Sequence, residues 1–282
     1  MSGKLSAVSI LYNPAVPSAH DLAEAISGML RDRGLASGSC EIERQTEAIA
    51  CIGSTDLIIT LGGDGTLLRA AHFAAVPGIP ILGVNLGKLG FLCDMGPDRV
   101  LEQLPFYLDG KAQVEERLML QAEQRRKGRT MVSGHALNDV VVGHASISSL
   151  IRVHAAINGN LLTTFAADGV IVATPSGSTA YSFAAGGPIV HPADQHLLLT
   201  PISPHKPRFG SVLAPANAVI TLELETAVPA VMSIDGDAET PVESGDVIEV
   251  RESPYKTRLL RKDSERYFFR ALRSTLKYGL EP

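Results

Sequence analysis

The stretch that most constrains this chain is residues 56–69, with the sequence DLIITLGGDGTLLR. Its first half is an apolar run of strand length that ends at two glycines, and the residues that follow have the apolar spacing of a helix. The pattern therefore predicts a strand, a tight turn and a helix. Glycines in such a turn permit a positive φ and let a ligand approach bare N–H groups at the start of the helix, where a phosphate binds well.

Asp64 is unexpected in a turn of this kind, because its negative charge repels a phosphate. It is therefore a candidate to accept a proton or to orient a metal ion beside the phosphate. The alternative is an ordinary strand-to-helix turn in which Asp64 caps the helix and the glycines only make the bend. Glycines at 62, 63 and 65 favour the binding interpretation, since each adds an entropic cost that a simple turn does not require.

Composition narrows the possible partners. The 282 residues carry a net charge of −5 and contain no dense block of lysine and arginine, which argues against nucleic acid as a partner. Three cysteines without a CxxC pair are typical of reduced thiols in a cytosolic protein. The sequence contains neither a signal peptide nor an apolar run of membrane-spanning length, so we expect a cytoplasmic protein with no membrane partner.

Residues 1–111 are predicted to form an α/β domain. Strand-like apolar runs alternate here with helical patterns: strands at 7–12, 56–60 and 79–84, helices at 20–35 and 98–108. This alternation predicts a Rossmann-like parallel sheet with helices on its faces. Ligands of such sheets bind beyond the carboxyl ends of the strands, where the GGDGT turn falls. A second glycine-containing turn, 85–92, leaves the same edge, and its Lys88 is either a wall of one cleft or a solvated loop cation.

Residues 112–262 are predicted to form a mainly antiparallel β domain. Strand-like segments are separated by Lys127-Gly128, Asn158-Gly159 and Asp235-Gly236, which are typical of tight hairpin turns. The tail, residues 263–282, is apolar enough to pack back on the α/β domain. The predicted fold class is therefore α/β plus β-rich.

One stretch of the β-rich part, residues 168–190, departs from the hairpin pattern. A buried strand leads into a cluster of proline, serine, glycine and threonine, followed by small residues around Tyr181. Small side chains let a planar ring lie against the backbone, Tyr181 can stack or donate a hydrogen bond, and Thr179 and Ser182 can bond ribose or amide groups. A tightly packed corner between a helix and a strand is the alternative.

Taken together, GGDGT at 62–66, Asn138-Asp139 in LNDVVV and the 168–190 stretch resemble the NAD kinase family, whose members phosphorylate NAD on its adenosine ribose to give NADP. Similar GGDGT turns occur in diacylglycerol and sphingoid-base kinases and in phosphofructokinases. The 168–190 stretch separates NAD kinases from these lipid and sugar kinases.

The resemblance implies an NAD site between the two domains of a homodimer or homotetramer. ATP or polyphosphate would donate the phosphoryl group, with Mg²⁺ or another divalent cation held mainly by the substrate phosphates. Asp64 would accept the proton of the ribose 2′-hydroxyl. Asn138 would bind adenine, Asp139 a ribose and Asp168 the nicotinamide amide. The remaining NAD positions are Gly65, Ala166, Thr179, Ala180, Tyr181, Ser182, Phe183, Ala184, Ser203 and Asp237, and the phosphate positions are Gly62, Gly63, Gly65 and Thr66. Independently of the resemblance, Arg69 lies one helical turn beyond Thr66 and either faces the phosphates or is an exposed helix arginine.

This chain has Asp139 where the family usually has glutamate, a shorter segment at 206–210, and Ala166 where some relatives carry a basic residue. Two other functions agree with parts of the pattern: a lipid or sugar kinase of the wider GGDGT group, and a non-catalytic dinucleotide sensor. Asp64 argues against the sensor, since a pure binder of an anionic ligand would gain affinity by losing that charge.

Overall fold

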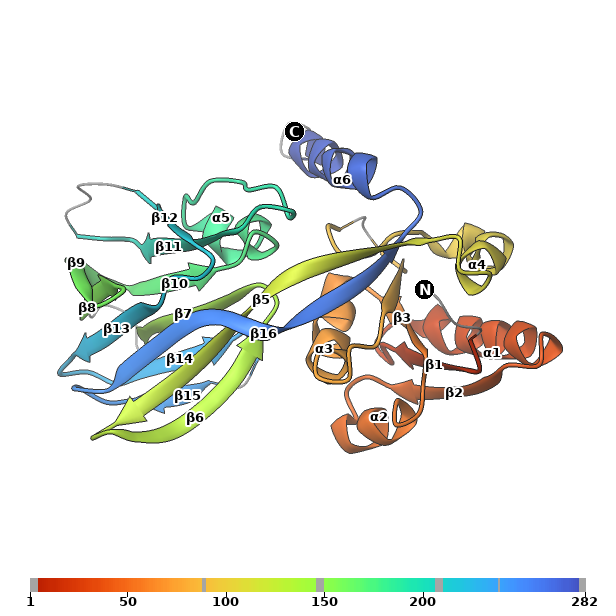
Figure 1. Cartoon of the computed structure of the whole chain (residues 1–282), viewed down its shortest axis with the longest axis horizontal. Coiled ribbons are helices and arrows are strands. Elements are labelled where there is room, and N and C mark those ends of the chain that lie inside the picture. Colours follow the sequence, from red (N-terminus) through yellow and green to blue (C-terminus); the bar gives the residue numbers. More distant parts are fainter. Residues whose placement is uncertain (1–4, 88–89, 146–149, 206–209, 238, 279–282) are drawn as a thin grey trace. The chain divides into compact units, whose positions relative to one another are not determined.

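The computed structural model describes residues 5–87, 90–145, 150–205, 210–237 and 239–278. The chain forms two compact units (Figure 1): unit 1 comprises Met1–Arg117 and Lys256–Pro282, and unit 2 comprises Leu118–Tyr255. The sequence pattern assigned 112–117 and 256–262 to the β-rich part, whereas these residues belong to unit 1. The strands β5 (Gln113–Arg126) and β16 (Val247–Arg261) each contain residues of both units, so no change of residue pattern marks either boundary.

Unit 1 is built on a parallel sheet with the strand order β2-β1-β3-β4. Near its end, β16 adds to this sheet through a parallel pairing of Leu259 with Ile81. The elements are β1 (Ala7–Tyr12), α1 (Pro17–Asp32), β2 (Ala36–Glu41), α2 (Gln45–Cys51), β3 (Leu57–Gly62), α3 (Asp64–Ala74), β4 (Ile81–Asn85), the 3-10 helix η1 (Pro97–Arg99), α4 (Val100–Leu108) and α6 (Ser264–Tyr278).

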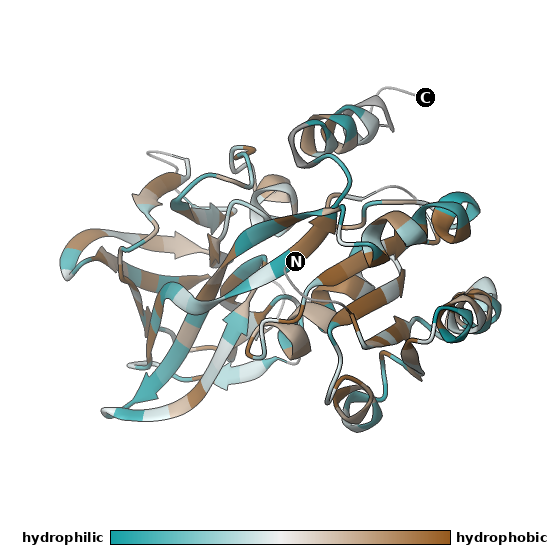
Figure 2. Ribbon diagram, turned by 45° about the vertical axis from the view of Figure 1, so that its right-hand side comes forward, coloured by the Kyte–Doolittle hydropathy of each residue, from teal (hydrophilic) through white to brown (hydrophobic). Residues whose placement is uncertain are grey.

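Burial explains why these segments take these forms. Every residue of β3 is buried, as expected for a central parallel strand covered on both faces. Helix α1 buries Ala19, Ala23, Ile26 and Leu30, whose spacing of three to four residues places them on one face. Strands β1, β3 and β4 are largely hydrophobic, whereas the edge strand β2 is mixed, and hydrophilic residues lie on the helices (Figure 2).

Unit 2 consists mainly of antiparallel strands in two sheets. One has the order β12-β11-β10-β7-β14-β15; the other contains β16-β13-β8-β9, with β5 pairing both β16 and β6. The remaining elements are β6 (Arg129–Ala136), β7 (Asp139–His144), β8 (Ile151–Ile157), β9 (Asn160–Ala167), β10 (Gly169–Ala173), η2 (Gly177–Thr179), α5 (Tyr181–Ala184), β11 (His196–Ile202), β12 (Val212–Pro215), β13 (Ile220–Glu225), β14 (Ala230–Ile234) and β15 (Thr240–Val242).

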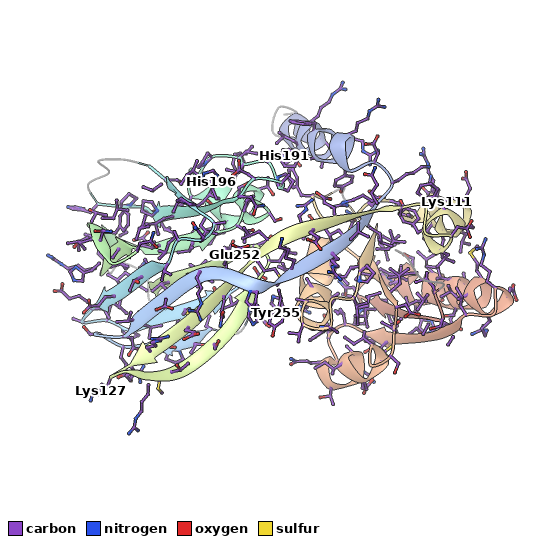
Figure 3. The ribbon with its side chains drawn as sticks, viewed as in Figure 1. Lys111, Lys127, His191, His196, Glu252 and Tyr255 are labelled. Atoms are coloured by element: carbon purple, nitrogen blue, oxygen red, sulfur yellow. The ribbon has the colours of Figure 1, made fainter. Side chains whose placement is uncertain are left out.

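The three predicted hairpin turns are present. Lys127 and Gly128, Asn158 and Gly159, and Asp235 and Gly236 all have positive φ, between 50° and 77°. Positive φ at both central residues matches the right-handed twist of the flanking strands. Lys127 lies at the tip of the β5–β6 hairpin (Figure 3). The α/β part and the antiparallel β part confirm the predicted fold class. No helix in the described ranges is long and apolar enough to span a membrane.

Candidate functional site

The GGDGT turn joins β3 to α3 in unit 1. Gly63 is the residue before the helix, with φ of −108°, and Asp64 is the first helical residue. Gly63 holds the cap position and the Asp64 carboxylate accepts N–H groups of residues 91–93, which argues against the alternative in which Asp64 caps the helix. The expected positive φ is also wrong, because none of Gly62, Gly63 and Gly65 has one. A left-handed backbone conformation therefore does not explain why these three positions are glycine.

Close packing explains one of the three glycines. A Cβ at Gly62 would lie 2.1 Å from Oγ1 of Thr66, whose side chain is buried against it. A Cβ at Gly63 or Gly65 would meet no heavy atom within 4 Å. Since packing does not require glycine at these two positions, they leave bare backbone at the helix N-terminus, where an anion is favoured.

The carboxylate of Asp64 is bonded to the second glycine-containing turn. Oδ2 accepts the N–H of Phe91 at 2.7 Å, and Oδ1 accepts those of Leu92 and Cys93 at 3.1 and 3.3 Å. We call Asp64 with the amides of 91–93 the Asp64 clamp. A Cβ at Gly90 would lie 2.2 Å from Asp64 Oδ2, so only glycine fits there. Lys88, the other candidate of this turn, lies outside the described residues.

Arg69 lies further along α3. Its Nη1 is 3.9 Å from Oε1 of Glu43, and both side chains are 55% exposed. Such a loose surface pair contributes little to stability, so Arg69 is available to an anionic ligand.

A second clamp lies in unit 2, around Asp235. Its Oδ2 accepts the N–H of Leu137 at 2.7 Å, and its Oδ1 accepts those of Asn138 and Asp139 at 2.7 and 3.0 Å. The backbone N–H of Asp235 in turn donates to the carbonyl of Asp139 at 2.9 Å. We call Asp235 with the amides of 137–139 the Asp235 clamp. It fixes the backbone on which Asn138 and Asp139 are presented.

The segment after β10 packs directly on this turn. Thr174 donates from its hydroxyl to the carbonyl of Leu137 at 2.6 Å and from its N–H to that of Asn138 at 2.8 Å. A Cβ at Gly177 would lie 2.1 Å from the carbonyl oxygen of Asn138. The predicted motifs at 138–139 and 168–190 therefore meet through backbone contacts in unit 2. This arrangement depends on Asp235 and Gly177, to which the sequence pattern assigned no positioning role. The sequence feature that could have indicated such a role for Asp235 is the choice of aspartate before Gly236, where a turn of this type also accepts asparagine.

Asp139 is 5% exposed. Burial, and secondarily the charge of Asp235, raise the pKa of its carboxyl to about 7. Asp139 is thus poised between its neutral and ionised forms at physiological pH, so that it can donate or accept a hydrogen bond.

The 179–184 segment presents its residues unequally. Tyr181 and Phe183 are exposed, at 46% and 44%. Thr179 donates from its hydroxyl to the carbonyl of Ser176 at 3.2 Å. Ser182 is fully buried, and its hydroxyl shares a 3.1 Å hydrogen bond with that of Thr200. The expected bond from the Ser182 side chain to a ribose or amide therefore has no support in this arrangement, whereas Tyr181 is accessible for stacking.

Three further predicted positions gather at the opposite end of β10. Asp168 precedes β10, its N–H donates to the carbonyl of Ile202 at 3.0 Å, and its Oδ1 lies 3.5 Å from Nε2 of His144. The N–H of His205 donates to the carbonyl of Ala166 at 2.8 Å, next to the exposed Ser203, which has φ of 46°. Asp237 is not one of these three: it is exposed and follows β14, whose Ile234 pairs with Val140 near the Asp139 end of β7.

The two groups of unit 2 lie at opposite ends of one pair of strands. In the β7–β10 register, Asp139 pairs with Ala173 and Gly143 pairs with Gly169. Four residues of strand separate these pairs by roughly 13 Å. This spacing suits an elongated ligand whose two ends are recognised separately.

A cavity of about 470 Å³ in unit 1 contains none of the predicted site residues. It is lined by Asp94, Met95, Gly96, Asp98, Arg99, Gln103, Lys262, Asp263 and Arg270. Within the described ranges, no group of three or more histidine, cysteine, aspartate or glutamate side chains is arranged to hold a metal ion.

Two family models match the chain. The ATP-NAD kinase N-terminal domain matches residues 18–112, and the ATP-NAD kinase C-terminal domain matches residues 137–262. An NAD kinase of Dehalococcoides mccartyi is 37% identical over 96% of this chain and 95% of its own length. An NAD kinase of Heliobacterium modesticaldum is 39% identical over 96% of this chain and 99% of its own length.

Solved structures share the fold. The crystal structure of yeast NADH kinase complexed with NADH has a TM-score of 0.85 and 24% identity, over 100% of this chain and 90% of its own. An NAD kinase from Archaeoglobus fulgidus in complex with ATP has a TM-score of 0.78 and 23% identity, over 95% of this chain and 99% of its own.

Proposed function

The chain belongs to the NAD kinase family, and from this premise we propose that it transfers the terminal phosphoryl group of ATP to the 2′-hydroxyl of the adenosine ribose of NAD, giving NADP. The observation that carries the proposal is the match of both family domains to a chain that holds Asp64 at a glycine-lined helix N-terminus. Membership in this family, rather than in the lipid or sugar kinases with similar turns, favours a dinucleotide as the acceptor.

In unit 1, Asp64 is the proton acceptor and the bare backbone at Gly63 and Gly65 receives phosphate oxygens, with Gly62, Thr66 and Arg69 beside them. Phosphoryl transfer depends on alignment and charge neutralisation more than on covalent help, so this small set suffices. An ionised carboxylate offers about four acceptor positions. The clamp uses three of them, so Asp64 takes the hydroxyl proton at the remaining position or after one amide has been released.

In unit 2, the end of β7 near Asn138 and Asp139 recognises the adenosine, and the end near Asp168 recognises the nicotinamide amide. The β7–β10 register supports this division, because it separates the two groups by several residues of strand. Tyr181 and Phe183 supply exposed aromatic faces. Gly65, Ala166, Thr179, Ala180, Ser182, Ala184, Ser203 and Asp237 complete the proposed NAD set, Ser182 through its backbone.

The donor set fits Mg²⁺ bound in the way that nucleotide enzymes commonly bind it, through one or two carboxylates plus substrate phosphates. Asp64 is the carboxylate of this chain beside the proposed phosphate path, and the described residues contain no dedicated metal cage. When bound, the ion neutralises charge on the transferred phosphoryl group. We place this activity in the cytoplasm, in a homodimer or homotetramer.

One assay tests the proposal. Purified protein is incubated with NAD, Mg²⁺ and either ATP or polyphosphate, and NADP is measured with an NADP-specific dehydrogenase. We expect NADP with ATP, and the second arm measures whether polyphosphate also serves as donor. NAD binding without NADP from either donor contradicts the proposal and favours a dinucleotide sensor.

A further inference from the structure

The 90–93 loop, whose N–H groups bond the Asp64 carboxylate, is also bonded through its carbonyl groups. The Asp64 clamp uses the N–H groups of 91–93, whereas the neighbouring carbonyls are bonded by residues more than 165 positions later in the chain. The hydroxyl of Tyr267 donates to the carbonyl of Gly90 at 2.8 Å, and Nη2 of Arg261 donates to the carbonyl of Phe91 at 3.3 Å. The peptide group between Gly90 and Phe91 is thus bonded at both its C=O and its N–H, and Phe91 is bonded at its N–H and its C=O, within unit 1.

Arg261 is fully buried among charged and aromatic partners. Its Nε donates to Oε2 of Glu115 at 2.8 Å, its Nη1 lies 3.8 Å from Oδ1 of Asp94, and its guanidinium carbon lies 4.0 Å above the ring of Tyr267. A buried ionic group of this kind is often no more stabilising than apolar residues of the same volume. The same guanidinium therefore joins a buried charged cluster to the Phe91 carbonyl, and the second contact links Arg261 to the loop.

Apolar packing supports the same attachment. The ring of Phe91 lies 6.1 Å from that of Phe268, the residue after Tyr267, and both Tyr267 and Phe268 are buried. Helix α6 therefore contacts the 90–91 segment through one hydrogen bond and one aromatic pair. Because the 91–93 amides bond to Asp64, any displacement of this segment moves the carboxylate.

We propose that Tyr267 and Arg261 are positioning residues that hold the 90–93 loop and, through it, set the orientation of the Asp64 carboxylate for phosphoryl transfer. This inference rests on the proposed function of Asp64. Neither residue touches the proposed substrates in this scheme. Their effect is therefore on turnover and not on NAD binding.

The test uses Tyr267→Phe, which removes only the hydroxyl that bonds Gly90, and Arg261→Lys, which keeps the charge and removes the planar fork. Arg258→Lys is the matched control. Arg258 lies three residues earlier on β16 and also bonds a carboxylate and a backbone carbonyl, Glu116 at 3.3 Å and Gly78 at 3.2 Å, but it does not contact the 90–93 loop.

For one lost hydrogen bond we expect kcat to fall about 5-fold in Tyr267→Phe, and about 10-fold in Arg261→Lys. The KM for NAD should stay within about 2-fold of wild type in both, and Arg258→Lys should be unchanged within the same margin. In an Asp64→Asn background, Tyr267→Phe should lower kcat less than about 2-fold. If Tyr267 acts only by positioning the Asp64 carboxylate, its substitution has little further effect once that carboxylate is gone, so the two effects on kcat are not additive. Equal losses in both backgrounds would overturn the proposal.

A second readout does not need substrate. Amide hydrogen exchange at Phe91, Leu92 and Cys93 should be faster in Tyr267→Phe and unchanged in Arg258→Lys. Unchanged exchange in Tyr267→Phe also overturns the proposal. If wild type makes no NADP, the proposed function fails, and the exchange experiment still decides whether Tyr267 holds the loop.

Discussion

The two units share one hydrogen-bonding arrangement, but the aspartate at its centre has a different proposed role in each. In each, one aspartate accepts three consecutive backbone N–H groups: Asp64 those of 91–93, and Asp235 those of 137–139. In unit 1 the carboxylate is the proposed reacting group and the loop positions it. In unit 2 the carboxylate is the support, and the segment it holds carries Asn138 and Asp139, the proposed binding groups.

The supports of the two clamped segments differ accordingly. The 137–139 segment leads straight into β7 and is bonded by Thr174 as well as by Asp235. The 90–93 loop is outside regular structure and depends on side chains from β16 and α6. Substitutions around the Asp235 clamp, which a strand supports, should therefore leave kcat nearly unchanged. Substitutions around the Asp64 clamp, which a loop supports, should lower kcat.

Asp64→Asn should abolish most turnover. Loss of general-base help costs about 10²–10⁴-fold, or roughly 3–5 kcal/mol in activation free energy, while the KM for NAD stays near the wild-type value. NADP formation and NAD titration measure the two quantities. Turnover close to wild type would remove Asp64 from the role of base.

Asp235→Asn should act on binding and stability. The amide side chain keeps one acceptor oxygen for the three N–H groups, so we expect a loss of about 2–3 kcal/mol in the free energy of unfolding and a KM for NAD raised about 10-fold or more. Urea denaturation and steady-state kinetics check this. Glu223→Gln is the control, because the Glu223 side chain is exposed on β13 and belongs to neither clamp nor to the proposed NAD set. A selective loss of kcat would contradict the division between the clamps.

Asp139→Asn should change how stability depends on pH. The folded pKa of Asp139 is raised from 3.8 to about 7, so the folded state binds the extra proton between those values and loses stability as pH rises through that window. The variant should lack this contribution and gain of order 2 kcal/mol relative to wild type between pH 5 and pH 7. Denaturation at several pH values measures it. Parallel pH profiles for the two proteins would argue against the raised pKa.

Gly90→Ala and Gly177→Ala form a matched pair. A Cβ at 90 meets the Asp64 carboxylate at 2.2 Å, and one at 177 meets the Asn138 carbonyl at 2.1 Å. Each clash must be relieved by a shift of the clamped segment. We expect Gly90→Ala to lower kcat about 10-fold and Gly177→Ala to raise the KM for NAD by a similar factor. The same kinetic pattern in both variants would mean that the clamps do not serve separate steps.

The fold class was predictable because alternating apolar and polar patterns carry it. The buried run of β3 and the turn at Asn158-Gly159 are local signals, and both appear where the pattern placed them. The GGDGT turn was predictable as a strand-to-helix junction, but not its backbone. The glycines there have ordinary negative φ, and Gly62 is explained by contact with Thr66.

The partners of the site residues could not be read from the sequence. Gly90 is 26 residues from Asp64, and Asp235 is about a hundred residues from the amides it holds. Such contacts depend on how strands pair across a sheet, which no local pattern specifies. Ser182 shows the reverse error: its residue type suited a ligand, but its place in a four-residue helix turns the hydroxyl inward to Thr200.

The order in which the ribosome delivers this chain matters for unit 1. Residues 118–255, the whole of unit 2, are synthesised between the GGDGT turn and the strand and helix that bring Arg261 and Tyr267 to the 90–93 loop. Asn138 and Asp168, proposed to bind dinucleotide, precede in the chain the two residues on which the alignment of the proposed base depends. The last part of the chain to leave the ribosome therefore completes the support of Asp64.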